Sequence, residues 1–450
     1  MVETGPEVCP KLDHEAIKEK ARKRKKNKRK DLPPAAPAVN IIKGFQTPVT
    51  SGGEESDLSV MSTPKLKATN SPALGGISAL KSRLDALSLD CEDRRPNFRP
   101  IRCLGKGAFG TVHLVKQQAT GRLYAQKQFK KASLTVHKRL IEQTRTERNI
   151  LESVNRHPFV VKLYYAFQDQ EKLYLILEYA QGGELFHHLA MERMFPEDVA
   201  AFYMAEMILA LEHLHHEVRV IYRDLKPENC LLDCEGHLLL TDFGLSKVAL
   251  EEEDPRTNSI LGTIEYMAPE IIQGLDYDFS VDWWSLGAIG FDLLTGSPPF
   301  GGNNHAKIQQ NILKQKLQLP YFIGPDAKDL LTRLLRKEPH KRLGGTSPKD
   351  LKTLKSHRFF RKIDWKKLEK RELEPPIQPV ITDPELAENF STDFTMLPLS
   401  PVVTRGSKNF DEYMQDVQEE RVTAEKNNPF GGFSFVASSS LLDNDEVMLA

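Results

Sequence analysis

The sequence predicts an α+β fold with two lobes, a small lobe built on an antiparallel sheet and a larger helical lobe. Residues 98–180 contain short segments of alternating apolar and polar residues around one helical pattern, which is typical of a small, sheet-rich unit. From Pro196 onward helical patterns dominate. One apolar face there recurs at steps of three or four and consists of Val199, Tyr203, Met207, Leu211 and Leu214. We expect the lobes to meet near residues 177–180, and clefts between lobes commonly bind nucleotides.

Composition divides the chain into three segments. Residues 1–97 are rich in Pro, Ser, Lys and Gly and have few large apolar residues, so we expect disorder there. Within them, the basic block at residues 20–30 predicts a nuclear import signal, a contact for RNA or acidic lipid, or only a solvated charged tail. Residues 98–360 would form the folded domain. Residues 361–450 are rich in proline and predict either a linker or a segment that wraps over the domain.

Global properties argue against several classes of protein. The 450 residues carry no net charge, which gives no general attraction to nucleic acid or membranes. The chain lacks the apolar run of about 20 residues that a membrane helix needs, and its start lacks the apolar core of a secretory signal. The five cysteines are odd in number and lack metal-binding spacing, which favours a reducing compartment. We therefore expect a cytoplasmic protein, which is also nuclear if the basic block is an import signal.

A glycine-rich turn joins the first two predicted strands. Gly105, Gly107 and Gly110 lie between the apolar residues Leu104 and Val112. Glycine lets the backbone approach a phosphate closely. The same spacing occurs in dinucleotide-binding folds, but these need a helix after the glycines. The next residues alternate as a strand instead, so we interpret the turn as a phosphate-binding hairpin.

The strongest chemical signal is the segment YRDLKPEN at residues 222–229, followed by DFG at residues 242–244. It combines a candidate base, Asp224, and a cation, Lys226, with two oxygen ligands suited to Mg²⁺. These ligands are Asn229 and Asp242. Phosphoryl transfer from ATP requires these residue types at these intervals. We predict that Asp224 accepts the proton of a substrate hydroxyl and that Lys226 neutralises the moving phosphoryl group.

A lysine between these two motifs is a candidate for binding ATP. Lys127 lies in the predicted strand YAQKQF and shares one face of it with Ala125. We predict that Lys127 binds the α- and β-phosphates. Its expected partner in an ion pair is Glu147, which lies in a predicted helix over residues 143–151.

In this order the motifs resemble those of the protein kinases, from about Phe98 to Phe360. The resemblance implies the bilobal protein kinase fold, with ATP and Mg²⁺ bound between the lobes. It implies that Leu177 sets the depth of the adenine pocket, and that Glu270 pairs with Arg342. It also implies that Asp282 holds the backbone of the catalytic loop. The ATP-binding residues that it implies are Leu104, Gly105, Gly107, Gly110, Val112, Ala125, Lys127, Glu147, Glu184 and Leu231.

Three features narrow the resemblance to the AGC kinases, and most closely to the branch that phosphorylates a small-subunit ribosomal protein. Tyr222 replaces the usual histidine, GTIEYMAPE occupies residues 262–270, and the tail ends in FGGFSF at residues 430–435. The resemblance implies that the tail wraps over the small lobe. Its phenylalanines, Phe430, Phe433 and Phe435, would fill a groove there against the helix that carries Glu147.

The same resemblance implies three sites of phosphorylation. They are Ser259 in the activation segment, with Thr257 as its rival, Ser400 in a turn motif, and Ser434 between the tail phenylalanines. A phosphoinositide-dependent kinase would modify Ser259, and a target-of-rapamycin complex would modify Ser434. Phosphate on Ser259 would pair with basic residues. Relatives also carry a histidine four residues before Glu147, where this chain has Gln143, so the grip of that phosphate on the helix is open.

By this resemblance the chain is a serine/threonine kinase in growth and nutrient signalling to ribosomal protein and translation. Lys226 and Thr263 match serine/threonine rather than tyrosine kinases. Glu184 and Glu228 match carboxylates that bind a substrate arginine, which predicts Arg-x-Arg-x-x-Ser targets. We expect a monomer. The alternatives are a pseudokinase scaffold, which would lack Lys127 or an equivalent catalytic residue, and a nucleic-acid-binding protein that acts through the basic block.

Overall fold

A computed structural model describes most of the chain after Arg95. The described residues are 97–107, 110–135, 138–154, 156–248, 263–345, 348–399 and 429–438, and all of them belong to one compact unit, Ser82–Ala450. The predicted N-terminal disorder, the basic block, Thr257, Ser259 and Ser400 lie outside the described residues. None of the described helices has the length and apolar character needed to cross a membrane.

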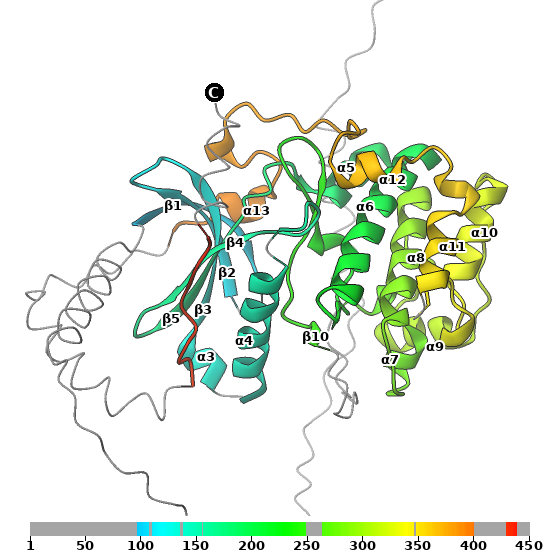
Figure 1. Ribbon diagram of the computed structural model, residues 1–450, viewed down its shortest axis with the longest axis horizontal. Helices are drawn as coiled ribbons and strands as arrows, with labels where there is room; N and C mark the ends of the chain where they lie inside the picture. The colour runs from blue at the N-terminus through cyan, green and yellow to red at the C-terminus, as the bar shows by residue number, and fades with distance from the viewer. Residues whose placement is uncertain are drawn as a thin grey trace, which may run out of the picture. The chain divides into compact units, whose positions relative to one another are not determined.

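The small lobe is a six-stranded antiparallel sheet with the order β1-β2-β3-β5-β4-β11 (Figure 1). The strands are β1 Phe98–Lys106, β2 Gly110–Gln117, β3 Leu123–Lys130, β4 Leu163–Gln168, β5 Lys172–Leu177 and β11 Phe435–Val436. The alternation of side chains sets the register, because one face of the sheet packs on the core. In this register Val112 lies opposite Lys127, and Ala125 lies opposite Leu177. The predicted strands around the glycine turn are confirmed.

Two helices follow β3, namely α3 Lys131–Thr135 and α4 Lys138–Ser153. The helix predicted over residues 143–151 is confirmed and extends further at both ends. Ile150 and Leu151 on α4 are buried in the same core as Phe129, Leu163 and Leu175 of the sheet. This packing holds Glu147 on the face of α4 that looks toward the site.

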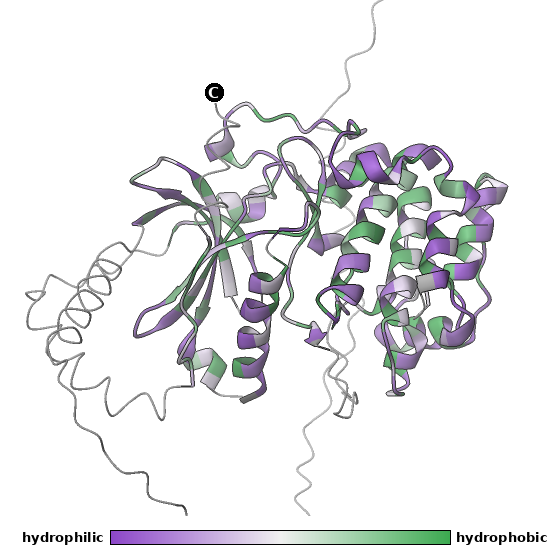
Figure 2. Ribbon diagram, viewed as in Figure 1, coloured by the Kyte–Doolittle hydropathy of each residue, from purple (hydrophilic) through white to green (hydrophobic). Residues whose placement is uncertain are grey.

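The large lobe is helical (Figure 1). Its helices are α5 Leu185–Glu192, α6 Glu197–His216, α7 Pro269–Ile272, α8 Ser280–Thr295, α9 His305–Lys314, α10 Pro325–Leu334 and α11 Pro348–Lys355. The amphipathic face predicted for α6 underestimates its burial, because every residue from Ala200 to Leu211 is buried. Helix α8 packs on α6, and so does strand β9 Leu238–Leu240, the partner of β8 Cys230–Leu232. Figure 2 accordingly shows apolar residues along much of α6 and α8.

Short strands of the large lobe carry the loops of the site. Strand β6 Gly183–Glu184 pairs with β8, and β8 pairs with β9. Strand β7 Val220–Ile221 pairs with β10 Lys247–Val248. The loop between α4 and β4 is bonded to β9, because Val161 donates its N–H to Leu240 at 3.0 Å and Leu240 donates to Phe159 at 3.0 Å. The two lobes are therefore linked by backbone hydrogen bonds beside the site.

The tail after residue 360 is more regular than the sequence predicts. It forms α12 Trp365–Glu369 and, after an irregular stretch, α13 Thr392–Thr395 near β1 (Figure 1). Arg371 in between pairs with Asp233 and Glu235 in the turn between β8 and β9. Gly236 in that turn has a φ of +93°, and an added Cβ would lie 2.0 Å from the carbonyl oxygen of Ile377. Only glycine accommodates both conditions, so this turn is shaped to receive the tail.

A buried ion pair joins α7 to the segment between α10 and α11 in the large lobe. Arg342 donates to the two carboxylate oxygens of Glu270 at 2.6 and 3.0 Å, and also to the carbonyl oxygen of Ser280 at 2.8 Å. The side chains of Arg342 and Glu270 are 0% and 3% exposed. The ion pair implied by the kinase resemblance is confirmed, and its forked geometry is the strong form of this interaction.

We predict that Arg342→Ala lowers the free energy of unfolding by about 3–5 kcal/mol, because it leaves the carboxylate of Glu270 buried without a partner. Denaturant titration of the full chain measures this loss. The matched control is Arg333→Ala, whose exposed pair with Asp329 on α10 should contribute less than about 1 kcal/mol. Equal losses in the free energy of unfolding for the two substitutions would contradict a stabilising role of the buried pair.

Candidate active site

The loop between β7 and β8 brings three predicted catalytic residues together. Lys226 Nζ lies 2.7 Å from Asp224 Oδ2, and Asn229 Nδ2 donates to the same oxygen at 2.9 Å. Asn229 also donates to the main-chain oxygen of Asp224 at 2.8 Å. Burial raises the pKa of Asp224 to about 6, although the charge of Lys226 opposes this rise. A carboxylate with a pKa near the working pH suits a general base.

Asp282 on α8 holds the backbone of this loop. Its Oδ2 accepts a hydrogen bond from Tyr222 N at 2.8 Å, and its Oδ1 accepts one from Arg223 N at 2.7 Å. Arg223 has a φ of +65°, a strained conformation for a residue with a side chain. The two bonds maintain this conformation, which aims the following residue, Asp224, into the site. The role implied for Asp282 is therefore confirmed.

Two further residues complete this support: His215, which the sequence did not predict, and Tyr222, which was singled out only as a replacement for the usual histidine. The ring of His215 on α6 lies 2.7 Å from Asp282 Oδ2. The hydroxyl of Tyr222 donates to the carbonyl oxygen of Thr241, and its ring packs edge-on against Phe243 at 5.2 Å between centroids. Tyr222 thus joins the catalytic loop to the DFG segment.

Lys127 is held between two carboxylates. Its Nζ lies 2.6 Å from Glu147 Oε1 on α4 and 3.1 Å from Asp242 Oδ1 of the DFG segment. Burial alone would lower the pKa of Lys127, but the two carboxylates raise it above its ordinary value. The charge of Lys127 in turn lowers the pKa of Asp242. The predicted ion pair with Glu147 is confirmed, and the lysine is a fixed cation at the centre of the site.

The glycine turn borders the same region. Gly107 N donates to Gly110 O at 2.9 Å, which closes the hairpin. An added Cβ on Gly110 would lie 2.6 Å from the carbonyl oxygen of Gln128, so this glycine lets β2 approach β3 closely. An added Cβ on Gly105 would have no neighbour within 4 Å, so its backbone faces open space. Such an exposed backbone suits close approach of a phosphate.

The remaining residues of the predicted adenine pocket come from both lobes. Leu104, Val112 and Ala125 lie in one apolar cluster of the small lobe. Leu231 lies on β8, opposite Glu184 on β6. Their contact with adenine stays a prediction.

The predicted magnesium ligands fit the ion by their chemistry. Asn229 bonds to Asp224 through its amide nitrogen, so its amide oxygen is available, and Asp242 supplies a carboxylate. The described residues contain no group of three or more His, Cys, Asp or Glu side chains arranged around a metal. Mg²⁺ normally takes only one or two protein carboxylates and completes its shell with water and phosphate oxygens. The two predicted ligands therefore suit magnesium bound together with a nucleotide.

A cluster of carboxylates lies beside the catalytic loop. Burial and the neighbouring charge of Glu228 raise the pKa of Glu184. A third carboxylate, Asp292 on α8, was not predicted from the sequence and accepts a hydrogen bond of 2.5 Å from the hydroxyl of Tyr266. Burial and the charges of Asp292 and Glu228 raise the pKa of Tyr266. A lone aspartate within a helix gives no signal in one sequence.

The tail motif occupies the groove that the resemblance implies. Phe430 and Phe433 are each 2% exposed and belong to the core that includes α4. Arg148 on α4 donates to the carbonyl oxygens of Phe433 and Ser434 at 3.2 Å each. The next residues form β11, which pairs with β4 at the edge of the sheet (Figure 1). The sequence did not predict this strand.

Comparison with known proteins settles the family. A model of the protein kinase domain matches residues 98–360, more than half of the chain. The chain belongs to the protein kinase family. The bilobal α+β fold expected from its motifs is thereby confirmed. Members of this family use ATP and Mg²⁺.

Several ribosomal protein S6 kinases are similar to this kinase domain and its flanks. Ribosomal protein S6 kinase beta of Caenorhabditis elegans is 46% identical over 351 residues, which cover 77% of this chain and 60% of the relative. Ribosomal protein S6 kinase alpha-1 of Homo sapiens is 48% identical over 302 residues, covering 66% of this chain and 40% of the relative. Ribosomal protein S6 kinase alpha-4 of Mus musculus is 45% identical over 362 residues, which cover 79% of this chain and 45% of the relative. The chain thus spans about half the length of the relatives that it matches.

We predict that Phe433→Ala releases the tail from the groove. A buried phenylalanine contributes about 3–5 kcal/mol, which exceeds what a short strand can supply alone. The amide of Ala437, which donates to Tyr164 O at 2.9 Å, should then exchange with deuterium at least tenfold faster.

The control for this prediction is Val436→Ala in the same strand. Val436 is 65% exposed, so the exchange of the Ala437 amide should hardly change. If both variants accelerate exchange equally, the aromatic side chains do not hold the tail.

Proposed function

We propose that this chain is a serine/threonine protein kinase that transfers the γ-phosphate of ATP to basic protein substrates. The observation that carries the proposal is the charged constellation in which Lys127 bonds to Glu147 and Asp242, while Asp224 bonds to Lys226. A pseudokinase scaffold has no need to keep these charges buried at such a cost in desolvation.

Each residue then has a distinct part in the transfer. Asp224 would accept the proton of the attacking hydroxyl, and its raised pKa favours this. Lys127 would bind the α- and β-phosphates, and Lys226 would neutralise the phosphoryl group as it moves. Asn229 and Asp242 would hold Mg²⁺, which when bound neutralises charge on the phosphate oxygens. The glycine turn would cover the phosphates from above.

The carboxylate cluster supports a preference for basic substrates. Glu184, Glu228 and Asp292 present acidic groups close to the catalytic loop. Arginine pairs with carboxylates through charge-assisted hydrogen bonds, and Glu184 and Glu228 are exposed, so a substrate can reach them. We therefore propose Arg-x-Arg-x-x-Ser targets. The names of the similar kinases support a ribosomal protein as one substrate, and we propose a place in growth and nutrient signalling.

Regulation would act through phosphorylation of Ser259, Ser400 and Ser434, with an upstream phosphoinositide-dependent kinase and a target-of-rapamycin complex as partners. The docked tail supports the part assigned to Ser434, because Arg148 already bonds to its carbonyl oxygen. We propose a monomer that works in the cytoplasm and enters the nucleus if the basic block acts as an import signal.

We predict that the full chain, activated by an upstream kinase, transfers labelled phosphate from ATP to an Arg-x-Arg-x-x-Ser peptide. Asp224→Ala should lower kcat by about 10²–10⁴-fold, because it removes the general base. Initial rates at saturating ATP measure this. ATP binding of the variant, followed by fluorescence, should be retained.

Two outcomes of this assay would contradict the proposal. Equal transfer by Asp224→Ala and the native chain would exclude Asp224 as the base. Absence of transfer by the native chain, despite ATP binding and phosphate on its activation segment, would favour a scaffold.

We predict that Glu184→Gln raises the KM for the arginine peptide about tenfold or more, because it removes a charge-assisted hydrogen bond. Its KM for a peptide with alanine in place of the arginines should not change. The matched control is Glu192→Gln at the exposed end of α5. If Glu184→Gln raises the KM for both peptides alike, the carboxylate serves the fold or the nucleotide rather than the substrate.

A further inference from the structure

The docked tail carries a second serine that faces an arginine. Beyond the phenylalanine motif, Ser438 Oγ accepts a hydrogen bond of 3.2 Å from Arg156 Nη2. Both residues are exposed. We propose that Ser438 is a phosphorylation site, that Arg156 binds its phosphate, and that this contact fastens the tail to the small lobe. The site lies four residues after Ser434 and is served by a different arginine.

The position of Ser438 is fixed by its neighbours rather than by its own contact. Phe435 and Val436 pair with Ala166 and Tyr165 of β4. Ala437 continues this ladder, since its N–H donates to Tyr164 O at 2.9 Å, and its side chain is buried. Ser438 therefore leaves the sheet from a defined point, and a phosphate on it would have little freedom to move away from Arg156.

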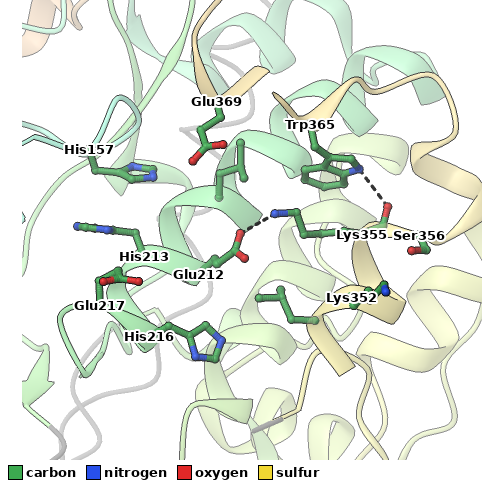
Figure 3. Close-up of a pocket in the computed structure, with 12 residues that line it drawn as sticks. His157, Glu212, His213, His216, Glu217, Lys352, Lys355, Ser356, Trp365 and Glu369 are labelled. Atoms are coloured by element: carbon green, nitrogen blue, oxygen red, sulfur yellow. Dashed lines mark hydrogen bonds and ion pairs between the residues drawn. The ribbon is translucent and has the colours of Figure 1, made fainter. Parts of the chain in front are cut away.

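Arg156 also stands on a fixed loop. Its own N–H donates to Val154 O at 2.7 Å, at the end of α4. The next residue, His157, stacks on His213 of α6 at 4.7 Å between centroids, and the two rings lie one above the other at one wall of a cavity (Figure 3). Burial, together with the neighbouring ring of His213, lowers the pKa of His157 to about 3, and burial also lowers the pKa of His213. The loop that carries Arg156 is thus attached to α4 and to the large lobe.

The chemistry of phosphorylation suits this pair. In the active site of a serine/threonine kinase, Ser438 Oγ would attack the γ-phosphorus of ATP. The new Oγ–P bond forms as the bond from that phosphorus to the bridging oxygen breaks, and ADP leaves. The hydroxyl proton passes to the catalytic base of that enzyme. The product carries a charge of about −1.5 to −2 and three acceptor oxygens in place of one hydroxyl. A guanidinium binds such oxygens in a forked, charge-assisted arrangement. The Nη2 group that already faces Ser438 needs no rearrangement to meet them.

Phosphate at this point would connect three elements. It would join the end of the tail strand to the loop after α4, and α4 carries Glu147, the partner of Lys127. Binding of the phosphate by Arg156 does not depend on the proposed catalytic function. Any effect of this phosphate on kinase activity does rest on the proposed function, because only an active kinase needs Glu147 held beside Lys127.

The experiment compares the full chain with serine or genetically encoded phosphoserine at position 438. Hydrogen exchange of the Ala437 amide reports tail docking without any need for catalysis. We expect phosphoserine to slow this exchange about threefold to fivefold, as a charge-assisted pair at the surface should. Arg156→Ala should abolish the slowing, and Arg156→Lys should restore part of it, because lysine keeps the charge but lacks the fork. Arg333→Ala, in the exposed pair on α10, is the control and should leave the slowing intact.

Two results would overturn the proposal of the phosphate contact. One is exchange that does not respond to phosphoserine. The other is equal slowing in native and Arg156→Ala chains, which would mean that another cation binds the phosphate. Failure of the proposed catalytic function would change neither result.

Use of the site in cells is tested by mass spectrometry. Trypsin cleaves after Lys426, and residues 427–450 contain no lysine or arginine, so Ser434 and Ser438 lie on the same peptide and fragmentation assigns phosphate between them. We expect phosphate on Ser438 in chain purified from expressing cells with phosphatases inhibited. A peptide that carries phosphate on Ser434 but never on Ser438 would contradict a regulatory role for this serine.

Discussion

A lysine held between two carboxylates is the interaction on which the site depends. Lys127 comes from the sheet of the small lobe, Glu147 from α4, and Asp242 from the segment after β9 in the large lobe. The Nζ atom lies 2.6 Å from one carboxylate and 3.1 Å from the other. Because the lysine is largely withdrawn from water, loss of either partner would leave a charge without compensation. The position of α4 is therefore constrained by both lobes at once, and anything that moves α4 must act on this cluster.

The large lobe uses buried charge in a different way, to set the backbone. Asp282 is 0% exposed, and its two oxygens accept the N–H groups of Tyr222 and Arg223. Left-handed backbone at a residue such as Arg223 costs about 1–2 kcal/mol, and these two bonds offset that cost. Since Asp282 stands on α8, which packs on α6, the direction of Asp224 is set by two deeply buried helices of the lobe. Catalytic geometry here is a consequence of core packing.

The sequence could predict elements that depend on local patterns and residues that the chemistry of phosphoryl transfer requires. Alternation placed Ala125 and Lys127 on one strand face, the order of the motifs predicted the pair of Lys127 with Glu147, and the kinase resemblance implied the pair of Glu270 with Arg342. It could not predict contacts between segments far apart that lack a motif. Asp292 and His215 are single polar residues in helices, and their meaning comes only from Tyr266 and Asp282 across the core. Strand β11 is two residues long, too short for a periodic signal, and exists because the edge of β4 offers it partners.

This last strand changes how the tail should be understood. Without it, β4 would be the edge of the sheet and would present unpaired backbone groups to solvent. The tail satisfies these groups through β11 while Phe430 and Phe433 fill the core beside α4. Its main chain accepts hydrogen bonds from Arg145 and Arg148 along the same helix. Gln143, earlier on the same helix, carries no charge. The tail therefore has the stronger effect on the position of α4, and through it on Glu147 and Lys127. It acts as an integral part of the small lobe rather than as a ligand bound to it.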